Sequence, residues 1–316
     1  MLAVLSITFP IFAVIAVGYL VVRIGPLTSQ TMKALGDFTM LVTLPCALFS
    51  ALASRNFSEV VNLNYLLTLA VAGLATQGAM ALIVRLTGTG PKRRALAVLG
   101  SATPNTAFLG FPIFLMIIPD HAAAIVAMNL LIENIILTPL GLTLLGRAAA
   151  EDGAPVSRLR LIRSIFLSVI RRPLIIGLLA GFAVVLLGIT PPSEIMRFTG
   201  MLGQAASPVA LVVIGGSLFG LNLRGDLSLA SLITAVKLLL HPALTIAALA
   251  GLSSLGLVHL GPELTIGLIL TTCLPMFAVF VLFGQEAGHE GLASLSVMLS
   301  TVLSFVTLNI ALALLL

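Results

Sequence analysis

Long apolar stretches dominate this sequence and restrict its fold more than any other feature. Only 9% of its 316 residues are charged, whereas a soluble domain carries about 25%. Because the stretches are continuously apolar and not alternating, they predict helices that cross a membrane rather than a transmembrane barrel. About ten such spans are expected, at 3–22, 33–53, 64–86, 94–118, 121–146, 172–189, 196–220, 228–250, 262–283 and 291–316.

Basic residues are distributed unevenly between the loops that join these spans. Counting alternate loops, one side receives Arg23, Lys33, Arg85, Lys92, Arg93, Arg94, Arg147, Arg158, Arg160, Arg163, Arg171, Arg172 and Arg224. The other side receives only Arg55 and Arg197. The positive-inside rule assigns the first side to the cytoplasm, so both termini are predicted to face outside. The net charge of +5 therefore reflects topology, and nucleic acid is not an expected partner.

The chain divides into two halves of five predicted spans each. Residues 1–146 and 172–316 form the halves, and a cytoplasmic loop at 147–171 joins them. Because the number of spans per half is odd, two related halves would be inverted relative to each other. Weak similarity supports a repeat, since Leu35-Gly36-Asp37 is echoed by Leu202-Gly203-Gln204, each with a proline soon after.

The fourth and ninth spans carry proline at corresponding places. Residues 100–112 read G-S-A-T-P-N-T-A-F-L-G-F-P, and Pro275 lies in T-T-C-L-P-M-F. Proline has no N–H and breaks a helix, and broken helix in a membrane is tolerated only inside protein or beside a cavity. Interrupted spans in matching positions point to a transporter's binding site near the membrane midplane. The sequence predicts that these two broken helices cross.

Half-helix ends at such a crossing favour an anion such as a carboxylate. Asn105 adds a side-chain donor, and the neighbouring threonines add hydroxyl groups. The candidate binding residues are Thr103, Pro104, Asn105, Thr106, Thr271, Thr272 and Pro275. The alternative for a single membrane proline is a kink absorbed by neighbouring helices. That alternative is preferred for Pro45, Pro139, Pro208 and Pro242.

A few ionisable and amide side chains lie inside predicted spans, where burial of a charge is costly. The candidates for coupling or support are Asn129, Glu133, Asn134, Lys237 and His241. Glu133 could carry a proton, bind a cation, pair with Lys237, or join helices by a hydrogen bond. Lys237 could instead extend to the membrane interface. Neither cofactor nor metal site is expected, and Na⁺ or H⁺ coupling stays open.

Sequence motifs of catalysis are missing. The chain contains no H-E-x-x-H, no G-x-S-x-G and no nucleotide-binding Walker loop. Cys46 and Cys273 lie in apolar spans and have no metal-ligand spacing. An enzyme or an ATP-driven pump is therefore not expected.

The motif P-N-T-A-F-L-G-F-P at 104–112 resembles the fourth-span motif of the auxin efflux carrier family. This family includes the plant PIN-FORMED transporters and bacterial malonate and malate permeases. Further similar motifs are distributed along nearly the whole chain, at 9–20, 44–49, 207–218, 237–242 and 273–284.

The resemblance implies two inverted five-span repeats, with spans one, two, six and seven as a scaffold and the others as a mobile unit. It also implies organic-anion transport by an elevator motion, with Asn105 as the carboxylate ligand, and plant members are dimers. Two departures argue against auxin itself as the substrate. Glu133 stands where plant relatives have glutamine, and the 147–171 loop is shorter than that of many plant members.

The sequence thus predicts a multi-pass protein of the cytoplasmic membrane that transports small organic anions by alternating access. A cation-coupled symporter or antiporter of the same fold, and a sensor that binds without transport, are the alternatives. The identity of the anion, the direction of transport, the coupling ion and the formation of a homodimer stay open.

Overall fold

The computed structural model describes residues 2–55, 61–150 and 171–315, and all regular structure in these ranges is helical. The prediction of an all-α membrane protein is therefore confirmed. Six helices are long and apolar enough to span a membrane: Ser29–Ala53, Leu63–Leu86, Ala122–Ala148, Ser193–Ser217, Leu227–Ser254 and Glu290–Leu315. Most of the predicted cytoplasmic loop 147–171 lies outside the described residues.

Shorter apolar helices occupy parts of the other predicted spans. They are Thr8–Ile24, Thr106–Ile117, Pro173–Leu186 and Pro262–Cys273, which correspond to spans one, four, six and nine. The count of ten spans, the inverted repeat and the location of the termini outside the cell stay predictions.

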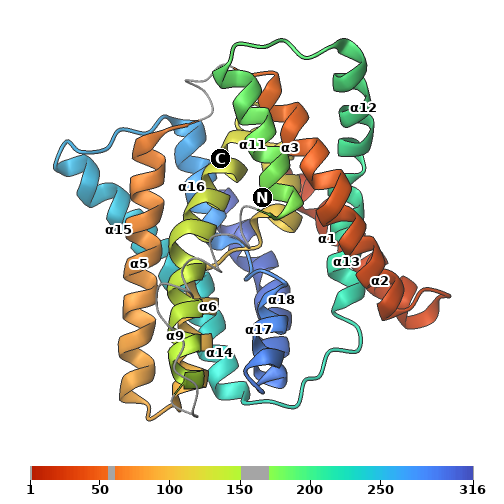
Figure 1. The fold of residues 1–316 in the computed structure, drawn as a ribbon. Coiled ribbons are helices and arrows are strands. Elements are labelled where there is room, and N and C mark those ends of the chain that lie inside the picture. Colours follow the sequence, from red (N-terminus) through yellow and green to blue (C-terminus); the bar gives the residue numbers. More distant parts are fainter. Residues whose placement is uncertain (1, 56–60, 151–170, 316) are drawn as a thin grey trace. The chain divides into compact units, whose positions relative to one another are not determined.

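The chain forms two compact units (Figure 1). Unit 1 comprises Met1–Asn62, Ala107–Met128 and Leu167–Gly220, and unit 2 comprises Leu63–Thr106, Asn129–Phe166 and Leu221–Leu316. Unit 1 thus holds predicted spans one, two, six and seven, as the family resemblance implies. It also holds residues 107–128, which the resemblance had grouped with the other spans.

Unit 1 is held together by close helix contacts. Its elements are α1 (Leu2–Ile24), α2 (Ser29–Phe38), η1 (Thr39–Thr43), α3 (Leu44–Ala53), α7 (Phe111–Ile117), α11 (Pro173–Leu186), α12 (Ser193–Gln204) and α13 (Ala206–Ser217), with η2 (Thr106–Gly110) and α8 (Ala122–Ile132) falling largely in it. A Cβ on Gly215 would lie 1.8 Å from the Ile15 carbonyl oxygen, and one on Gly18 would lie 2.2 Å from that of Val212. Only glycine permits this approach of α1 to α13, as small residues do between membrane helices.

Unit 2 contains the helices on either side of the predicted breaks. Its elements are α5 (Leu63–Leu86), α6 (Pro91–Ala102), η3 (Glu133–Leu137), α9 (Thr138–Ala150), α14 (Leu227–Ala235), η4 (Val236–Leu240), α15 (His241–Ser254), α16 (Pro262–Cys273), α17 (Phe280–Glu286) and α18 (Glu290–Leu315). Leu96, Ile233, Phe280 and Leu292 belong to its hydrophobic core. Gly100 packs against the Phe280 ring, because a Cβ there would lie only 3.0 Å from the ring.

Four helices widen locally into π-helical turns in the described residues, and each turn ends two residues before a proline. These turns are η1 before Pro45, η2 before Pro112, η3 before Pro139 and η4 before Pro242. In an α-helix the proline ring would clash with the carbonyl four residues earlier. The wider turn relieves this clash within the helix itself, and such turns are frequent at functional sites.

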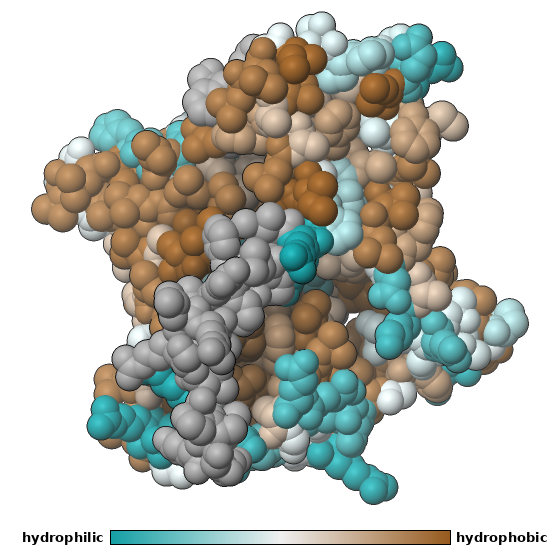
Figure 2. Space-filling view, in the orientation of Figure 1, coloured by the Kyte–Doolittle hydropathy of each residue, from teal (hydrophilic) through white to brown (hydrophobic). Residues whose placement is uncertain are grey.

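Apolar side chains cover the outer surface of α5 in unit 2 (Figure 2). Leu63, Leu67, Val71, Leu74 and Leu82 on this helix are all exposed. An apolar face of this kind suits contact with lipid rather than water.

Candidate functional site

Both predicted helix breaks are present, and both belong to unit 2. Helix α6 ends at Ala102 and helix resumes at Thr106, while α16 ends at Cys273 and α17 begins at Phe280. The backbone is extended at Thr103 and Leu274, the first residue beyond each half-helix. The interruptions therefore lie where Pro104 and Pro275 predicted them.

The two interrupted segments pair with each other. The Asn105 N–H donates to the Pro275 carbonyl at 2.8 Å, and the Phe277 N–H donates to the Thr103 carbonyl at 3.2 Å. Pro104 and Met276 form an isolated antiparallel bridge between these bonds. We call residues 103–105 and 274–279 the paired breaks. Each break thus supplies hydrogen-bond partners that the other lacks, as burial of open backbone requires.

Asn105 is the residue of the paired breaks whose polar side chain is available to bind a ligand. It is 6% exposed, and its side-chain amide makes no hydrogen bond to any described residue. The amide is not among the fully enclosed polar atoms that lack a partner in the described residues, so a small polar molecule can reach it. The amide can donate to one group and accept from another.

Thr271 is the centre of a buried network on the other break. Its hydroxyl accepts from the Asn129 amide at 2.7 Å and lies 3.3 Å from the Tyr65 hydroxyl. Tyr65 in turn donates to the Asn129 carbonyl oxygen at 2.8 Å. All three side chains are fully buried, and their polar atoms satisfy one another. The network therefore fixes the end of α16 against α5 and Asn129.

Glu133 contacts the residue that directly follows the fourth-span break. The Thr106 hydroxyl donates to the Glu133 carboxyl group. Glu133 opens η3 and is 8% exposed. A predicted support residue, Glu133, thus forms a hydrogen bond with a predicted binding residue, Thr106. The role of Glu133 in coupling stays a prediction.

Lys237 lies in η4 and points into unit 2. Its side chain is fully buried, and its ammonium group donates to the Thr272 and Leu274 carbonyls at 2.8 and 2.7 Å. No direct ion pair joins it to Glu133. In the described residues the Lys237 side chain is thus directed to backbone carbonyls, and its role in coupling stays a prediction.

The two other predicted support residues, Asn134 and His241, lie in η3 and at the start of α15. The Asn134 amide donates to the Leu130 carbonyl of its own helix at 2.8 Å. His241 is fully buried, and neither ring nitrogen has a partner among the described residues.

Sequence reasoning missed Tyr65 and Ser300. The Met276 N–H in the ninth-span break donates to the Ser300 hydroxyl at 3.4 Å. Tyr65 could have been recognised, because the chain has only two tyrosines and a tyrosine inside an apolar span needs a partner for its hydroxyl. Ser300 is one of several serines on α18 and carried no distinguishing signal.

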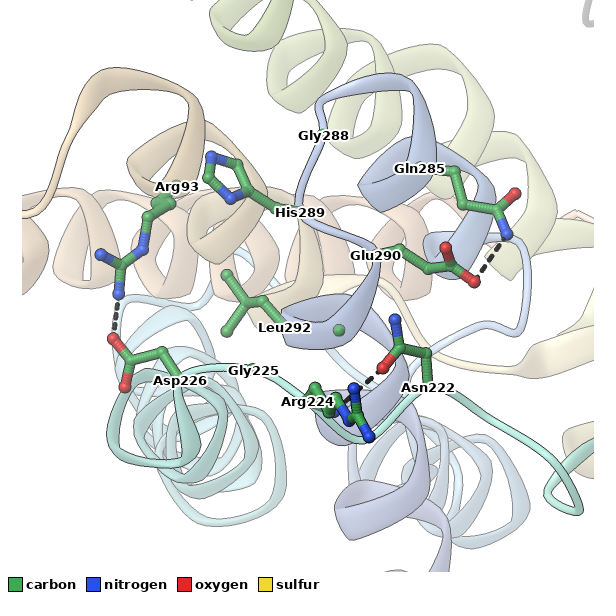
Figure 3. Close-up of a pocket in the computed structure, with 11 residues that line it drawn as sticks. Arg93, Asn222, Arg224, Gly225, Asp226, Gln285, Gly288, His289, Glu290 and Leu292 are labelled. Carbon is green, nitrogen blue, oxygen red and sulfur yellow. Dashed lines mark hydrogen bonds and ion pairs between the residues drawn. The ribbon is translucent and has the colours of Figure 1, made fainter.

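A second polar region of unit 2 lies where α6 and α14 begin and α17 ends (Figure 3). This charged pocket has a volume of about 600 Å³ and is lined by Arg93, Asn222, Arg224, Gly225, Asp226, Gln285, Gly288, His289, Glu290, Gly291 and Leu292. Arg93 forms an ion pair with Asp226, and Gln285 donates to Glu290 at 3.0 Å. Partial burial, aided by the positive charges of Arg93 and Lys92, lowers the pKa of His289.

Comparison with known proteins assigns the chain to a family. The family described as "Membrane transport protein" matches residues 3–312. The chain belongs to this family. The resemblance to the auxin efflux carriers is thereby confirmed, and the protein is a multi-pass membrane transporter rather than an enzyme.

A relative in Rhizobium meliloti (strain 1021) is described as a "Putative malonate transporter". It is 26% identical over 314 residues, which cover 96% of this chain and 93% of the relative. The similarity therefore extends over both halves of the chain and both helix breaks.

Proposed function

We propose that this family member is a secondary transporter of small organic anions and that the anion binds at the paired breaks. The observation that carries the proposal is the unpaired Asn105 amide, held in a buried segment between two half-helices. The description of the relative as a malonate transporter supports a carboxylate as the substrate class.

Asn105 would donate its amide N–H to one carboxylate oxygen of the substrate. A hydrogen bond to a charged acceptor contributes about 1.5–3 kcal/mol, more than one between neutral groups. Helix resumes at Thr106, and the start of a helix carries partial positive charge. The Thr106 hydroxyl is occupied by Glu133, so Glu133 would set the charge next to the substrate.

Transport would proceed by alternating access of an elevator type. Unit 2 carries the candidate site within itself, because Thr103–Thr106 and Leu274–Phe277 belong to it. In this proposal unit 2 moves as a body with its substrate while unit 1 stays fixed in the membrane. A sensor of the same fold would bind the anion without moving it.

Uptake into proteoliposomes tests this proposal. Wild-type protein should accumulate radiolabelled malonate faster than empty liposomes do. The uptake rate of Asn105→Ala should be lower than that of the wild type by about tenfold or more, because one charge-assisted hydrogen bond contributes about one to two powers of ten in affinity. The variant should elute from size-exclusion chromatography as the wild type does.

The outcomes separate the candidates. Malonate binding by wild-type protein without uptake would favour a sensor. Uptake by Asn105→Ala at the wild-type rate would contradict the site. A mono- and dicarboxylate screen by thermal shift identifies a better substrate if malonate is not transported, because a bound ligand raises stability by mass action.

A further inference from the structure

Lys237 places a positive charge where helix α16 ends. Its ammonium group is bound by the Thr272 and Leu274 carbonyls, one on each side of Cys273, the last residue of α16. The last carbonyls of a helix have no intrahelical donors and carry partial negative charge. In a helix broken at the membrane midplane, these are the groups that bind a coupling cation.

Two further carbonyls at this helix end also accept hydrogen bonds. The Leu274 N–H donates to the Thr271 carbonyl at 3.3 Å, and the Thr307 hydroxyl donates to the Cys273 carbonyl at 3.5 Å. Carbonyl oxygens are preferred ligands of hard cations such as Na⁺. The Lys237 ammonium therefore occupies the position that such an ion would need.

The location connects this charge to the anion site. Leu274 directly precedes Pro275, and the Pro275 carbonyl accepts from the Asn105 N–H. Thr106, which directly follows the other break, donates from its hydroxyl to the Glu133 carboxyl group. A positive charge here balances negative charge in a region with little water.

We infer that the Lys237 ammonium is a built-in substitute for a bound metal cation, so that anion transport needs no Na⁺. This inference rests on the proposed function and decides between its coupled and uncoupled forms. The opposite case is a lysine that only stabilises the fold, while Na⁺ binds elsewhere and drives transport.

The first experiment uses the wild-type protein. Uptake of radiolabelled malonate is measured in proteoliposomes with equal concentrations of sodium chloride or choline chloride outside. The inference predicts rates that agree within about twofold, since no tenfold change in site occupancy accompanies the ion. Uptake that falls about tenfold in choline would overturn it.

The second experiment removes the ammonium group. Lys237→Ala frees two carbonyls and leaves space for a small cation, so its uptake should be low in choline and rise about fivefold or more with Na⁺ or Li⁺, by mass action on the vacated site. Lys33→Ala is the matched control, because Lys33 is an exposed lysine of unit 1. It should behave as the wild type in both salts.

The remaining outcomes also decide. A folded Lys237→Ala that transports normally in choline, or that no monovalent cation restores, would overturn the inference. If that variant does not fold, the wild-type salt comparison decides alone. If wild-type protein takes up no malonate in either salt, the proposed function fails instead. The inference is then tested by melting temperature, which Na⁺ should not raise relative to choline.

Discussion

The paired breaks and the charged pocket are both polar regions of unit 2, but they hold their polar groups in opposite ways. At the breaks, the side chains of Thr271, Asn129 and Lys237 are fully buried. Asn129 donates to the Thr271 hydroxyl, and Lys237 donates to the carbonyl of the next residue, Thr272. In the pocket, the ion pair of Arg93 with Asp226 leaves these side chains 34% and 39% exposed. Exposed pairs contribute about 0–1 kcal/mol, whereas a buried polar group without a partner costs about 1–3 kcal/mol.

This difference shows that the number of charges does not identify the site. The pocket holds more charged residues, but water can solvate them at little cost. The breaks hold few polar groups, and each is either satisfied by the protein or, for Asn105, left available. Substitutions in the two regions should therefore differ in the size and in the kind of their effects.

The largest effect on stability is expected at the Thr271 network. Asn129→Ala leaves the Tyr65 and Thr271 hydroxyls buried with fewer partners and should lower the free energy of unfolding by about 2–4 kcal/mol. Thr143→Ala is the control, because its hydroxyl donates to the Pro139 carbonyl of its own helix at 2.7 Å. It should cost less than about 1.5 kcal/mol. Thermal unfolding in detergent measures both, and equal losses would remove the proposed distinction.

A smaller effect is expected at the ion pair of the charged pocket. Arg93→Ala should change the free energy of unfolding by less than about 1 kcal/mol. Asp226→Ala should cost more, about 1–2 kcal/mol, because Asp226 also caps α14 by accepting from the Leu229 N–H at 3.0 Å. The same unfolding assay compares the two variants. A larger loss for Arg93→Ala would show that the exposed pair matters more than the cap.

The smallest effect is expected from His289 and depends on pH. Its pKa is lowered by partial burial and by Arg93 and Lys92, so the folded state binds fewer protons than the unfolded state below the ordinary histidine pKa of about 6.5. Stability should therefore fall as pH decreases from about 7.5 to 5.5. His289→Gln should show a shallower decrease in melting temperature over this range. A steeper decrease in the variant would contradict the sign.

Much of the site could be predicted from single residues. Pro104 and Pro275 predicted both interruptions because proline cannot donate to a helix, and Asn105 was prominent as an amide in an apolar span. The pairing of Pro104 with Met276 could not be predicted, since it depends on how segments about 170 residues apart approach each other.

The environment of Lys237 was also beyond sequence reasoning. Its charge suggested an interface or an acidic partner, but its partners are backbone carbonyls, which every sequence contains. The π-helical turns are a similar case. The prolines predicted kinks, while the widening of the helix before them depends on local backbone geometry.

Direct binding compares the two regions most sharply. The dissociation constant for radiolabelled malonate is measured on purified wild-type protein, on Asn105→Ala and on Arg224→Ala, whose guanidinium belongs to the charged pocket. Asn105→Ala should weaken binding by about tenfold or more, and Arg224→Ala by less than about twofold. Wild-type affinity in Asn105→Ala together with lost binding in Arg224→Ala would contradict the assignment of the anion to the paired breaks.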